Sequence, residues 1–261
     1  MSEVYRIARG RLPLLVSIPH VGTEIPPDIG AALVPRAAQT EDADWHLERL
    51  YAFAAEMGAS LLVPRYARYV VDLNRPPENT PMYPGQNNTE LLPTRFFTGE
   101  PLYRAGAEPD AAEVERRVAR YWMPYHEALA AELARLKSEH GHALLFEGHS
   151  IQAELPWLFA GHLPDLNVGT VNGGSVLPGL RERLAAVLAD QTDFSHVIDG
   201  RFKGGYITRR YGRPDEGVQA LQMEMCWHCY MAPWHEYDEK RAARVQPLLR
   251  RLMQTMLDGR A

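Results

Sequence analysis

Two short apolar runs of the sequence each lead into a histidine, and these two histidines are the first candidates for chemistry. Residues 14–18 run into His20, and residues 143–146 run into Glu147 and His149. Strands that end in polar side chains deliver them to the crevice at the carboxyl edge of an α/β sheet. Because imidazole is a common ligand of zinc, two histidines in equivalent settings indicate one shared metal or catalytic centre.

The third ligand of such a centre is less well defined by the sequence. A catalytic zinc usually takes three ligands from His, Asp and Glu, and keeps one position for water. Four carboxylates lie within reach of the two histidines in the sequence: Glu24, Asp42, Asp44 and Glu147. Glu24 shares a face with His20 only in a helix, which Pro26 and Pro27 disfavour. Asp44 precedes a helical pattern, where a carboxylate also serves as an N-cap. The residues alone leave this choice open.

A further carboxylate, Glu224, lies in an otherwise apolar run at 218–225. A carboxylate that faces inward there is costly unless it is paired or functional. Beside a metal-activated water it would be a general base. The alternation of a strand also allows Gln222 and Glu224 to share a face that is exposed to solvent.

Arginines are the candidates for binding a substrate carboxylate, because the guanidinium fork matches a carboxylate bidentately. Asn74 and Arg75 follow an apolar run, and Arg209 and Arg210 lie in a Gly-rich segment at 202–214. The alternative for any one of these arginines is a salt bridge at the surface. The Asn74–Arg75 pair, at the end of a predicted strand, is the stronger candidate.

The overall composition excludes several classes of protein. The chain has 261 residues, a net charge of -5 and a pI near 6.1, so nothing favours binding to nucleic acid or acidic membranes. No apolar run is long enough to span a bilayer, and residues 1–10 do not resemble a secretory signal. Cys226 and Cys229 are too few for a disulfide framework, and we interpret them as reduced thiols beside the core. These features predict a cytoplasmic protein.

Strand-like and helix-like patterns alternate along the chain, which predicts one α/β domain over residues 1–261 with a mixed or mostly parallel sheet. The predicted strands lie at 14–18, 60–63, 69–71, 143–146, 168–171, 196–198 and 218–225. The predicted helices lie at 47–57, 110–139, 178–190 and 237–257, with the second kinked or split at Pro124. The segments at 74–109 and 202–214 are predicted loops.

Several of these segments together resemble the N-formylglutamate amidohydrolase family. The resemblance rests on Ser17-Ile-Pro-His-Val-Gly22, Asp42-Ala-Asp-Trp-His46, Tyr69-Val-Val-Asp-Leu-Asn-Arg-Pro76 and Gly148-His149-Ser150, and residues 201–209 and 222–224 extend it. It implies hydrolysis of N-formyl-L-glutamate to formate and L-glutamate, in histidine degradation. It also implies a three-layer sandwich of helices around a sheet, as in the related zinc carboxypeptidases.

The resemblance further implies a bound zinc ion, with His20 and His149 as two of its ligands. The carboxypeptidase pattern has a Glu three residues after the first His, where this chain has Thr23. We therefore assign the third ligand to Asp44. Glu224 falls at the position of the general base, which would take a proton from water and return it to the departing amine.

The remaining roles implied by the resemblance concern the substrate and the support of the metal ligands. The implied substrate is a small molecule with two carboxylates, which we assign to Asn74, Arg75 and Arg209, with Arg210 in reserve. Glu147 and His46 are expected to lie behind the metal ligands and to orient them through hydrogen bonds. Two rival functions remain: a metal-dependent amidase for another N-acyl acidic amino acid, and a non-catalytic binding protein with the same fold.

Overall fold

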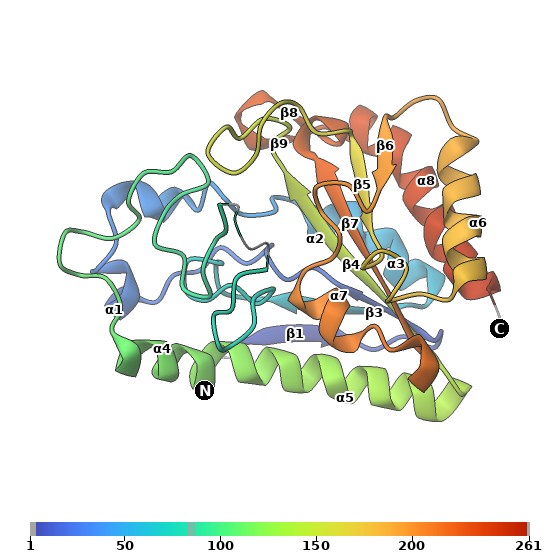
Figure 1. Ribbon diagram of the computed structural model, residues 1–261, viewed down its shortest axis with the longest axis horizontal. Coiled ribbons are helices and arrows are strands. Elements are labelled where there is room, and N and C mark those ends of the chain that lie inside the picture. Colours follow the sequence, from blue (N-terminus) through green and yellow to red (C-terminus); the bar gives the residue numbers. More distant parts are fainter. Residues whose placement is uncertain (1–3, 83–84, 86, 260–261) are drawn as a thin grey trace.

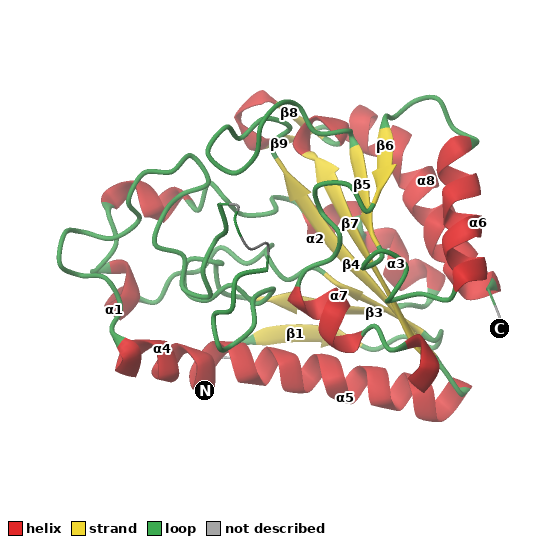
Figure 2. Ribbon diagram, viewed as in Figure 1, coloured by secondary structure: helices red, strands yellow, loops and turns green. Residues whose placement is uncertain are grey.

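The computed structural model describes residues 4–82, 85 and 87–259, and these contain a seven-stranded sheet between two layers of helices (Figures 1 and 2). The order across the sheet is β1-β3-β2-β4-β7-β5-β6. The strands are β1 (Tyr5–Ala8), β2 (Leu14–Ser17), β3 (Ser60–Pro64), β4 (Ala143–Ile151), β5 (Leu166–Gly169), β6 (His196–Ile198) and β7 (Val218–Cys226). A separate pair, β8 (Met231–Ala232) and β9 (Glu236–Tyr237), lies near the C-terminal helix in the sequence.

Longer helices cover both faces of the sheet, and short helical turns lie in the loops (Figure 2). The α-helices are α1 (Pro27–Gly30), α2 (Leu47–Leu50), α3 (Ala52–Met57), α4 (Ala111–Arg117), α5 (Met123–His140), α6 (Pro178–Ala189), α7 (Tyr206–Tyr211) and α8 (Glu239–Asp258). The short turns are η1 (Pro35–Gln39), η2 (Val118–Trp122), η3 (Pro214–Glu216), η4 (Trp227–Cys229) and η5 (Pro233–His235). Within the described residues, no helix combines the length and the apolar character that a bilayer crossing requires.

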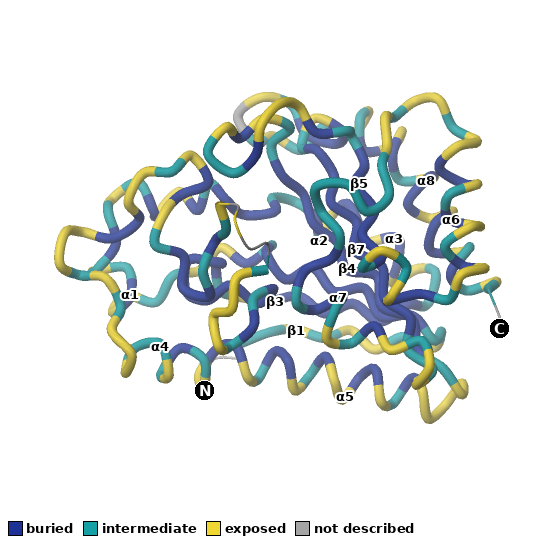
Figure 3. The backbone as a smooth tube through the Cα atoms, viewed as in Figure 1, coloured by how far each residue is buried: buried dark blue, intermediate teal, exposed yellow. Residues whose placement is uncertain are grey.

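The two layers follow from the alternation of side chains along the central strands. Successive side chains of a strand point to opposite faces of a sheet. On β4, Leu144 and Phe146 pack in the core that includes Leu249 of α8, whereas Leu145 packs in the core that includes Leu133 of α5. Because both faces of β4 are covered, the whole strand is buried, as are its neighbours in the sheet (Figure 3).

The predicted mixed, mostly parallel sheet is confirmed. Strands β3, β2, β4 and β7 run parallel to one another, β1 is antiparallel to β3, and β5 is antiparallel to β7. The carboxyl ends of the four parallel strands therefore meet at one edge. The loops that follow β2 and β3 carry most of the residues that the sequence singled out as chemical, and β4 and β7 carry Glu147, His149 and Glu224.

The central strand is longer than predicted, because the expected end at Phe146 is wrong. β4 pairs with β7 over nine residues and continues through Glu147 and His149 to Ile151. Gly148 permits this, since a Cβ there would lie 2.8 Å from the ring of Tyr51. As residues two apart on a strand, Glu147 and His149 project from the same face of the sheet.

Two other predictions of local structure are also wrong. Residues 69–71 form a turn rather than a strand, and the Arg117 guanidinium donates to the carbonyls of Tyr69 and Val70 at 3.4 and 3.3 Å. The predicted loop at 202–214 contains the helix α7. The predicted break at Pro124 is confirmed, and the wider π-helical turn η2 joins α4 to α5 just before this proline.

Candidate metal centre and active site

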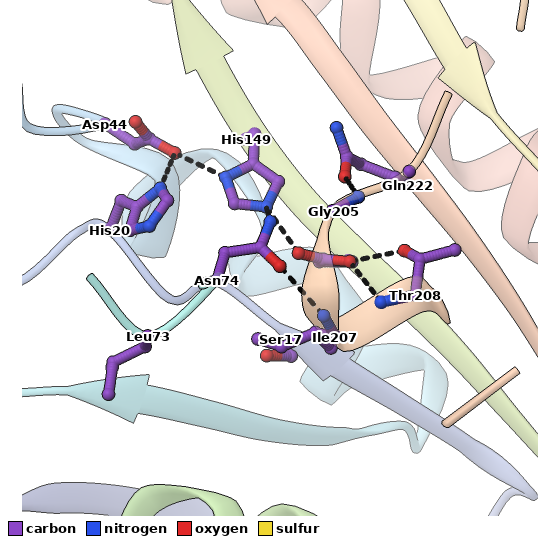
Figure 4. A network of polar contacts seen from close by, with 12 residues as sticks. Ser17, His20, Asp44, Leu73, Asn74, His149, Gly205, Ile207, Thr208 and Gln222 are labelled. Carbon is purple, nitrogen blue, oxygen red and sulfur yellow. Dashed lines mark hydrogen bonds and ion pairs between the residues drawn. The ribbon is translucent and has the colours of Figure 1, made fainter. Parts of the chain in front are cut away.

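Three side chains from distant parts of the chain converge in the interior: His20, Asp44 and His149 (Figure 4). Asp44 Oδ2 lies 3.1 Å from His149 Nδ1 and 3.9 Å from His20 Nδ1. One potential ligand atom from each residue lies within 4.8 Å of the others. All three residues are buried, with 2–4% of their surface exposed. The donor set is two imidazole nitrogens and a carboxylate oxygen, which suits a borderline cation such as zinc.

The fold positions these three residues by different means. His20 lies in the turn after β2, and its carbonyl accepts a hydrogen bond from Asp44 N at 3.0 Å. His149 lies inside β4, opposite Glu224 in the register with β7. The loop of Asp44 is fixed to β4 by Tyr230, whose hydroxyl donates to the Trp45 carbonyl at 2.7 Å. The same hydroxyl lies 2.7 Å from Ser150 Oγ.

Each histidine is backed by a buried carboxylate. His20 Nε2 lies 2.7 Å from Asp72 Oδ1, and His149 Nε2 lies 2.7 Å from Glu147 Oε1. Burial by itself raises the pKa of Asp72, but Arg68 and His20 hold it well below its usual range. For His20 these contacts fit a proton on Nε2, which donates to Asp72, and a lone pair on Nδ1. His149 has a carboxylate at each ring nitrogen, because Asp44 Oδ2 lies 3.1 Å from its Nδ1. The His20 tautomer is the one that a metal ligand requires, and His149 would bind a cation through Nδ1 once the proton has left that nitrogen.

The electrostatics of this group fit a cation. Asp44 Oδ2, 3.1 Å from His149 Nδ1, can be met there by a proton or by a bound cation, and the charged Arg68 Nη1 lies 3.4 Å from His20 Nδ1. His149 is flanked by Asp44 and Glu147, which, against the effect of burial, raise its pKa well above the usual value. Burial and the neighbouring Arg68 lower the pKa of His20. The surplus of negative charge around His149 is the charge that a bound divalent ion would neutralise.

Glu224 lines the same cavity as the three converging residues. It is 7% exposed, and within the described part of the chain its carboxylate makes no hydrogen bond. Burial raises the pKa of Glu224 to about 8, with Asp44 adding to the rise and His149 opposing it. A buried carboxyl with a pKa near neutrality and free oxygens is suited to accept and return a proton.

Three arginines also line this cavity: Arg68, Arg75 and Arg201. Arg68 is buried, donates to Asp72 Oδ2 at 2.5 Å and lies with its guanidinium carbon 4.4 Å from the centre of the Phe97 ring. Its Nε is buried without a hydrogen-bond partner among the described residues. Arg75 is braced by Thr89, which accepts from Nε through its carbonyl and from Nη2 through its hydroxyl. The cavity therefore offers positive charge around the candidate metal centre.

Asn74 lies between the candidate metal centre and α7. Its Oδ1 accepts from Ile207 N at 2.9 Å, and its Nδ2 lies 3.1 Å from His149 Nε2 (Figure 4). A Cβ at Gly205 would lie 2.2 Å from Asn74 Nδ2, so only glycine allows this approach. Asn74 thus ties the loop after β3 to α7, and it also lines the cavity.

The other candidate residues lie elsewhere. Arg209 Nε donates to the Gly204 carbonyl at 2.8 Å, and Arg210 is exposed; neither lines the cavity in the part of the chain that the structure describes. Glu24 pairs with Arg65 at the surface, at 2.7 Å. His46 lies at the start of α2, where its Nε2 is 2.7 Å from the His235 carbonyl. The helix begins after His46, so Asp44 is not its N-cap.

Sequence reasoning missed Asp72, Arg68 and Thr208. Asp72 stands inside the 69–76 segment, two residues before Asn74, and a carboxylate that close to a predicted binding pair was the available signal. Arg68 had no comparable signal in the sequence, because only the folded loop brings it to Asp72 and the cavity. Thr208 donates from both its backbone N and its hydroxyl to Glu147 Oε2, which holds that carboxylate against His149.

Buried nitrogen and carboxylate ligands, a glutamate with free oxygens and a cavity lined by arginines form an arrangement suited to metal-dependent hydrolysis. The profile of the N-formylglutamate amidohydrolase family matches residues 12–231. This chain belongs to that family.

Relatives with known names agree with this assignment. An N-formylglutamate deformylase of Pseudomonas aeruginosa is 48% identical over 260 residues, which is 98% of this chain and 97% of that protein. One of Pseudomonas putida is 44% identical over 259 residues, with the same coverage.

Solved structures share the fold. The crystal structure of an N-formylglutamate amidohydrolase from Ralstonia eutropha is 25% identical and superposes with a TM-score of 0.80 over 97% of both chains. A gene product of Agrobacterium tumefaciens, 18% identical, superposes with a TM-score of 0.74 over 98% of this chain and 96% of its own. The second likeness concerns the fold alone.

Proposed function

We propose that this chain is a zinc-dependent N-formylglutamate deformylase, which hydrolyses N-formyl-L-glutamate to formate and L-glutamate. The observation that carries the proposal is the buried group of His20, Asp44 and His149 in one cavity with the Glu224 carboxylate. The family and the two Pseudomonas relatives support the choice of substrate.

His20 and His149 would hold the zinc ion through Nδ1, and Asp44 through a carboxylate oxygen. Bound there, zinc supplies Lewis acidity towards the formyl oxygen and lowers the pKa of water from about 15.7 towards roughly 7. With the metal bound, Asp72 and Glu147 would hold a proton on the Nε2 atoms that they face and fix the planes of the rings.

Glu224 holds and moves the proton in this reaction. It takes a proton from the attacking water as the bond between oxygen and the formyl carbon forms. It then gives that proton to the nitrogen as the C–N bond breaks, which leaves formate and the free amine of L-glutamate. Its burial keeps its pKa high enough for the proton to travel in both directions.

The arginines of the cavity would bind the two carboxylates of the substrate. Arg75 and Arg201 are our candidates for this role because both line the cavity, which Asn74 also lines. Arg68 lies closer to the metal centre, 3.4 Å from His20 Nδ1, and would stabilise the negative charge that develops on the formyl oxygen. Arg209 and Arg210 would then bind no part of the substrate directly.

The substitution Glu224→Gln tests the proposal. It removes the proton acceptor but keeps the shape of the side chain, so formate release should fall about a hundred- to ten-thousandfold while zinc content stays unchanged. Glu182→Gln, an exposed change on α6, is the matched control and should retain activity. Loss of zinc in Glu224→Gln would make Glu224 a ligand, and retained turnover would exclude it as the base.

An arginine series tests how the substrate is bound. Arg75→Ala and Arg201→Ala should each lower kcat/KM about ten- to hundredfold, mainly through KM, because each removes a charged hydrogen-bond donor. Arg210→Ala, which changes an exposed side chain, should leave kcat/KM within about twofold of the unsubstituted protein. If Arg210→Ala lowers kcat/KM and the other two variants do not, the substrate is bound by α7 instead. Formyl, acetyl and succinyl glutamate, compared in the same assay, test the acyl group.

A further inference from the structure

A second cluster of potential metal ligands lies outside the catalytic cavity. It consists of Asp165, His228 and Cys229, and one donor atom from each lies within 4.8 Å of the others. None of the three is among the described residues that line the cavity of Glu224. The set contains a thiol, an imidazole and a carboxylate, which together are typical ligands of thiophilic divalent cations such as zinc.

The sheet brings these three residues together. β5 pairs antiparallel with β7 so that Leu166 faces Met225, and Cys226 N donates to the Asp165 carbonyl at 2.9 Å. The chain turns immediately after β7 into η4, which carries His228 and Cys229 back over the start of β5. The cluster is therefore built on two paired strand ends rather than on a mobile surface loop.

The contacts within the cluster define which atoms are available. His228 Nε2 lies 2.5 Å from Asp165 Oδ1, and Cys229 Sγ lies 3.7 Å from the Asp165 carbonyl oxygen. The other carboxylate oxygen, Asp165 Oδ2, accepts from Ser195 N at 2.7 Å and from Ser195 Oγ at 2.8 Å. Ser195 thus fixes the carboxylate and leaves Oδ1 to face the imidazole.

The three residues of the cluster differ in how far they are buried. Cys229 is buried, Asp165 is partly buried, and the His228 side chain is 46% exposed, so a cation could enter from solvent past the imidazole. The nearby Arg241 donates to the His228 carbonyl, and its own charge is offset by Asp238 at 3.2 Å.

We propose that Asp165, His228 and Cys229 form a second binding site for one thiophilic divalent cation of the zinc class. The ligands would be Asp165 Oδ1, His228 Nε2 and Cys229 Sγ, with water in the position open to solvent. On binding, the hydrogen bond between His228 Nε2 and Asp165 Oδ1 opens, and the Nε2 proton moves to Nδ1 or to solvent so that the Nε2 lone pair can bind the metal. The S–H bond of Cys229 breaks, its proton passes to solvent and a sulfur–metal bond forms, so no oxidant or reductant is required. The site would cross-link the start of β5 to the turn after β7.

The geometry distinguishes Cys229 from its neighbour Cys226. The Cys226 thiol lies 3.3 Å from the Pro164 carbonyl, is fully buried and does not belong to the cluster of donor atoms. The spacing of the two cysteines resembles a redox pair, yet burial raises the pKa of both thiols. A protonated, buried thiol is a poor nucleophile, so thiol exchange is the weaker use of this segment.

Cadmium is the probe that tests the site. The chain has two cysteines, and the catalytic cluster has none, so an ultraviolet charge-transfer band of a cadmium–thiolate bond reports on residues 226 and 229 alone. Cd²⁺ titrated into protein that carries one equivalent of zinc should produce this band, and the band should saturate. Cys229→Ser should abolish it, whereas the matched variant Cys226→Ser should keep its full amplitude.

The outcomes separate this site from the catalytic one. No band in the unsubstituted protein, a band that survives in Cys229→Ser, or a band lost in Cys226→Ser would each overturn the proposal. Should Cys229→Ser fail to fold, His228→Ala provides the second test, and the cadmium concentration at half-saturation should rise at least tenfold; an unchanged value overturns the site. Formate release plays no part in the titration, so failure of the proposed deformylase activity would not affect its result.

Discussion

His149 lies inside β4, in the middle of the sheet, whereas His20 lies in the turn that follows β2. The strand-borne histidine is backed by Glu147, which comes from the same strand two residues earlier. The loop-borne histidine is backed by Asp72, which comes from another loop and is itself held by Arg68. The strand-borne half of the site (Glu147 and His149) is thus held by the hydrogen bonds of the sheet. The loop-borne half (His20, Asp72 and Arg68) is held by contacts between buried charged groups.

This difference predicts where the site is fragile. The pairing of β4 with β7 positions Glu147 and His149 independently of the metal. The loop-borne half depends on the ion pair between Asp72 and Arg68, which lose much of their hydration in the interior. We therefore expect substitutions in the loop-borne half to affect the fold as well as the metal, and substitutions in the strand-borne half to affect mainly the metal.

The largest effect is expected for Asp72→Asn. It leaves the buried Arg68 charge without its partner, which typically costs about 3–5 kcal/mol of unfolding free energy. Urea unfolding with excess chelator measures this cost without the contribution of bound metal. The control Glu24→Gln breaks the exposed pair with Arg65 and should leave the unfolding free energy unchanged. Equal stability of the two variants would contradict the distinction between the halves.

In the strand-borne half, Glu147→Gln should weaken zinc binding about ten- to hundredfold, because the carboxylate that orients His149 is lost. The unfolding free energy of the metal-free protein should fall less than in Asp72→Asn, since no buried cation is left unpaired. Competition with a chelator of known affinity measures the change, with Glu182→Gln as control. Unchanged zinc affinity would show that Glu147 does not support the ligand.

A smaller effect is expected from acid, again in the loop-borne half. His126 of α5 donates from Nε2 to the Leu73 carbonyl, next to Asp72, and its Nδ1 lies 3.0 Å from the Tyr211 hydroxyl. Burial lowers the pKa of His126 to about 4, so the unfolded chain binds its proton first as the pH falls. The stability that the neutral ring provides is complete above about pH 6.5 and is lost as the pH falls towards 4.

The variant His126→Gln isolates this contribution, because glutamine can donate and accept but does not titrate. Between pH 7 and pH 5 the unsubstituted protein should lose about 2 kcal/mol more unfolding free energy than the variant. Urea unfolding at the two pH values measures the difference. Identical losses would mean that His126 is not the group that makes this half of the site sensitive to acid.

The same comparison explains how much of the site could be predicted from sequence. His20 and His149 could be found because each follows or lies in an apolar run that forms a strand, and the sheet then brings them together. The length of β4 could not be predicted, because Glu147-Gly148-His149-Ser150 has the composition of a turn. These residues continue the strand because Glu147 and His149 find partners in the folded protein. The helical layers followed from the apolar periodicity of α5 and α8.

The rest depended on the path of the loops, which composition does not encode. Residues 69–71 are Tyr, Val and Val, which favour strands, but Arg117 donates to the carbonyls of Tyr69 and Val70 and the segment forms a turn. Arg209 was a reasonable candidate for substrate binding as long as its segment was expected to be a loop. The segment instead folds into α7, and Arg209 Nε donates to the Gly204 carbonyl just before that helix. Arg68 and Asp72 acquire their roles only when two loops meet at His20.

Anomalous diffraction at the zinc absorption edge, from crystals of the zinc-loaded protein, tests the central claim most directly. We predict a strong peak bonded to Nδ1 of His20, Nδ1 of His149 and one carboxylate oxygen of Asp44, with the Nε2 atoms still facing Asp72 and Glu147. A peak bonded through either Nε2, or zinc only at the Asp165 cluster, would contradict the account of the catalytic site.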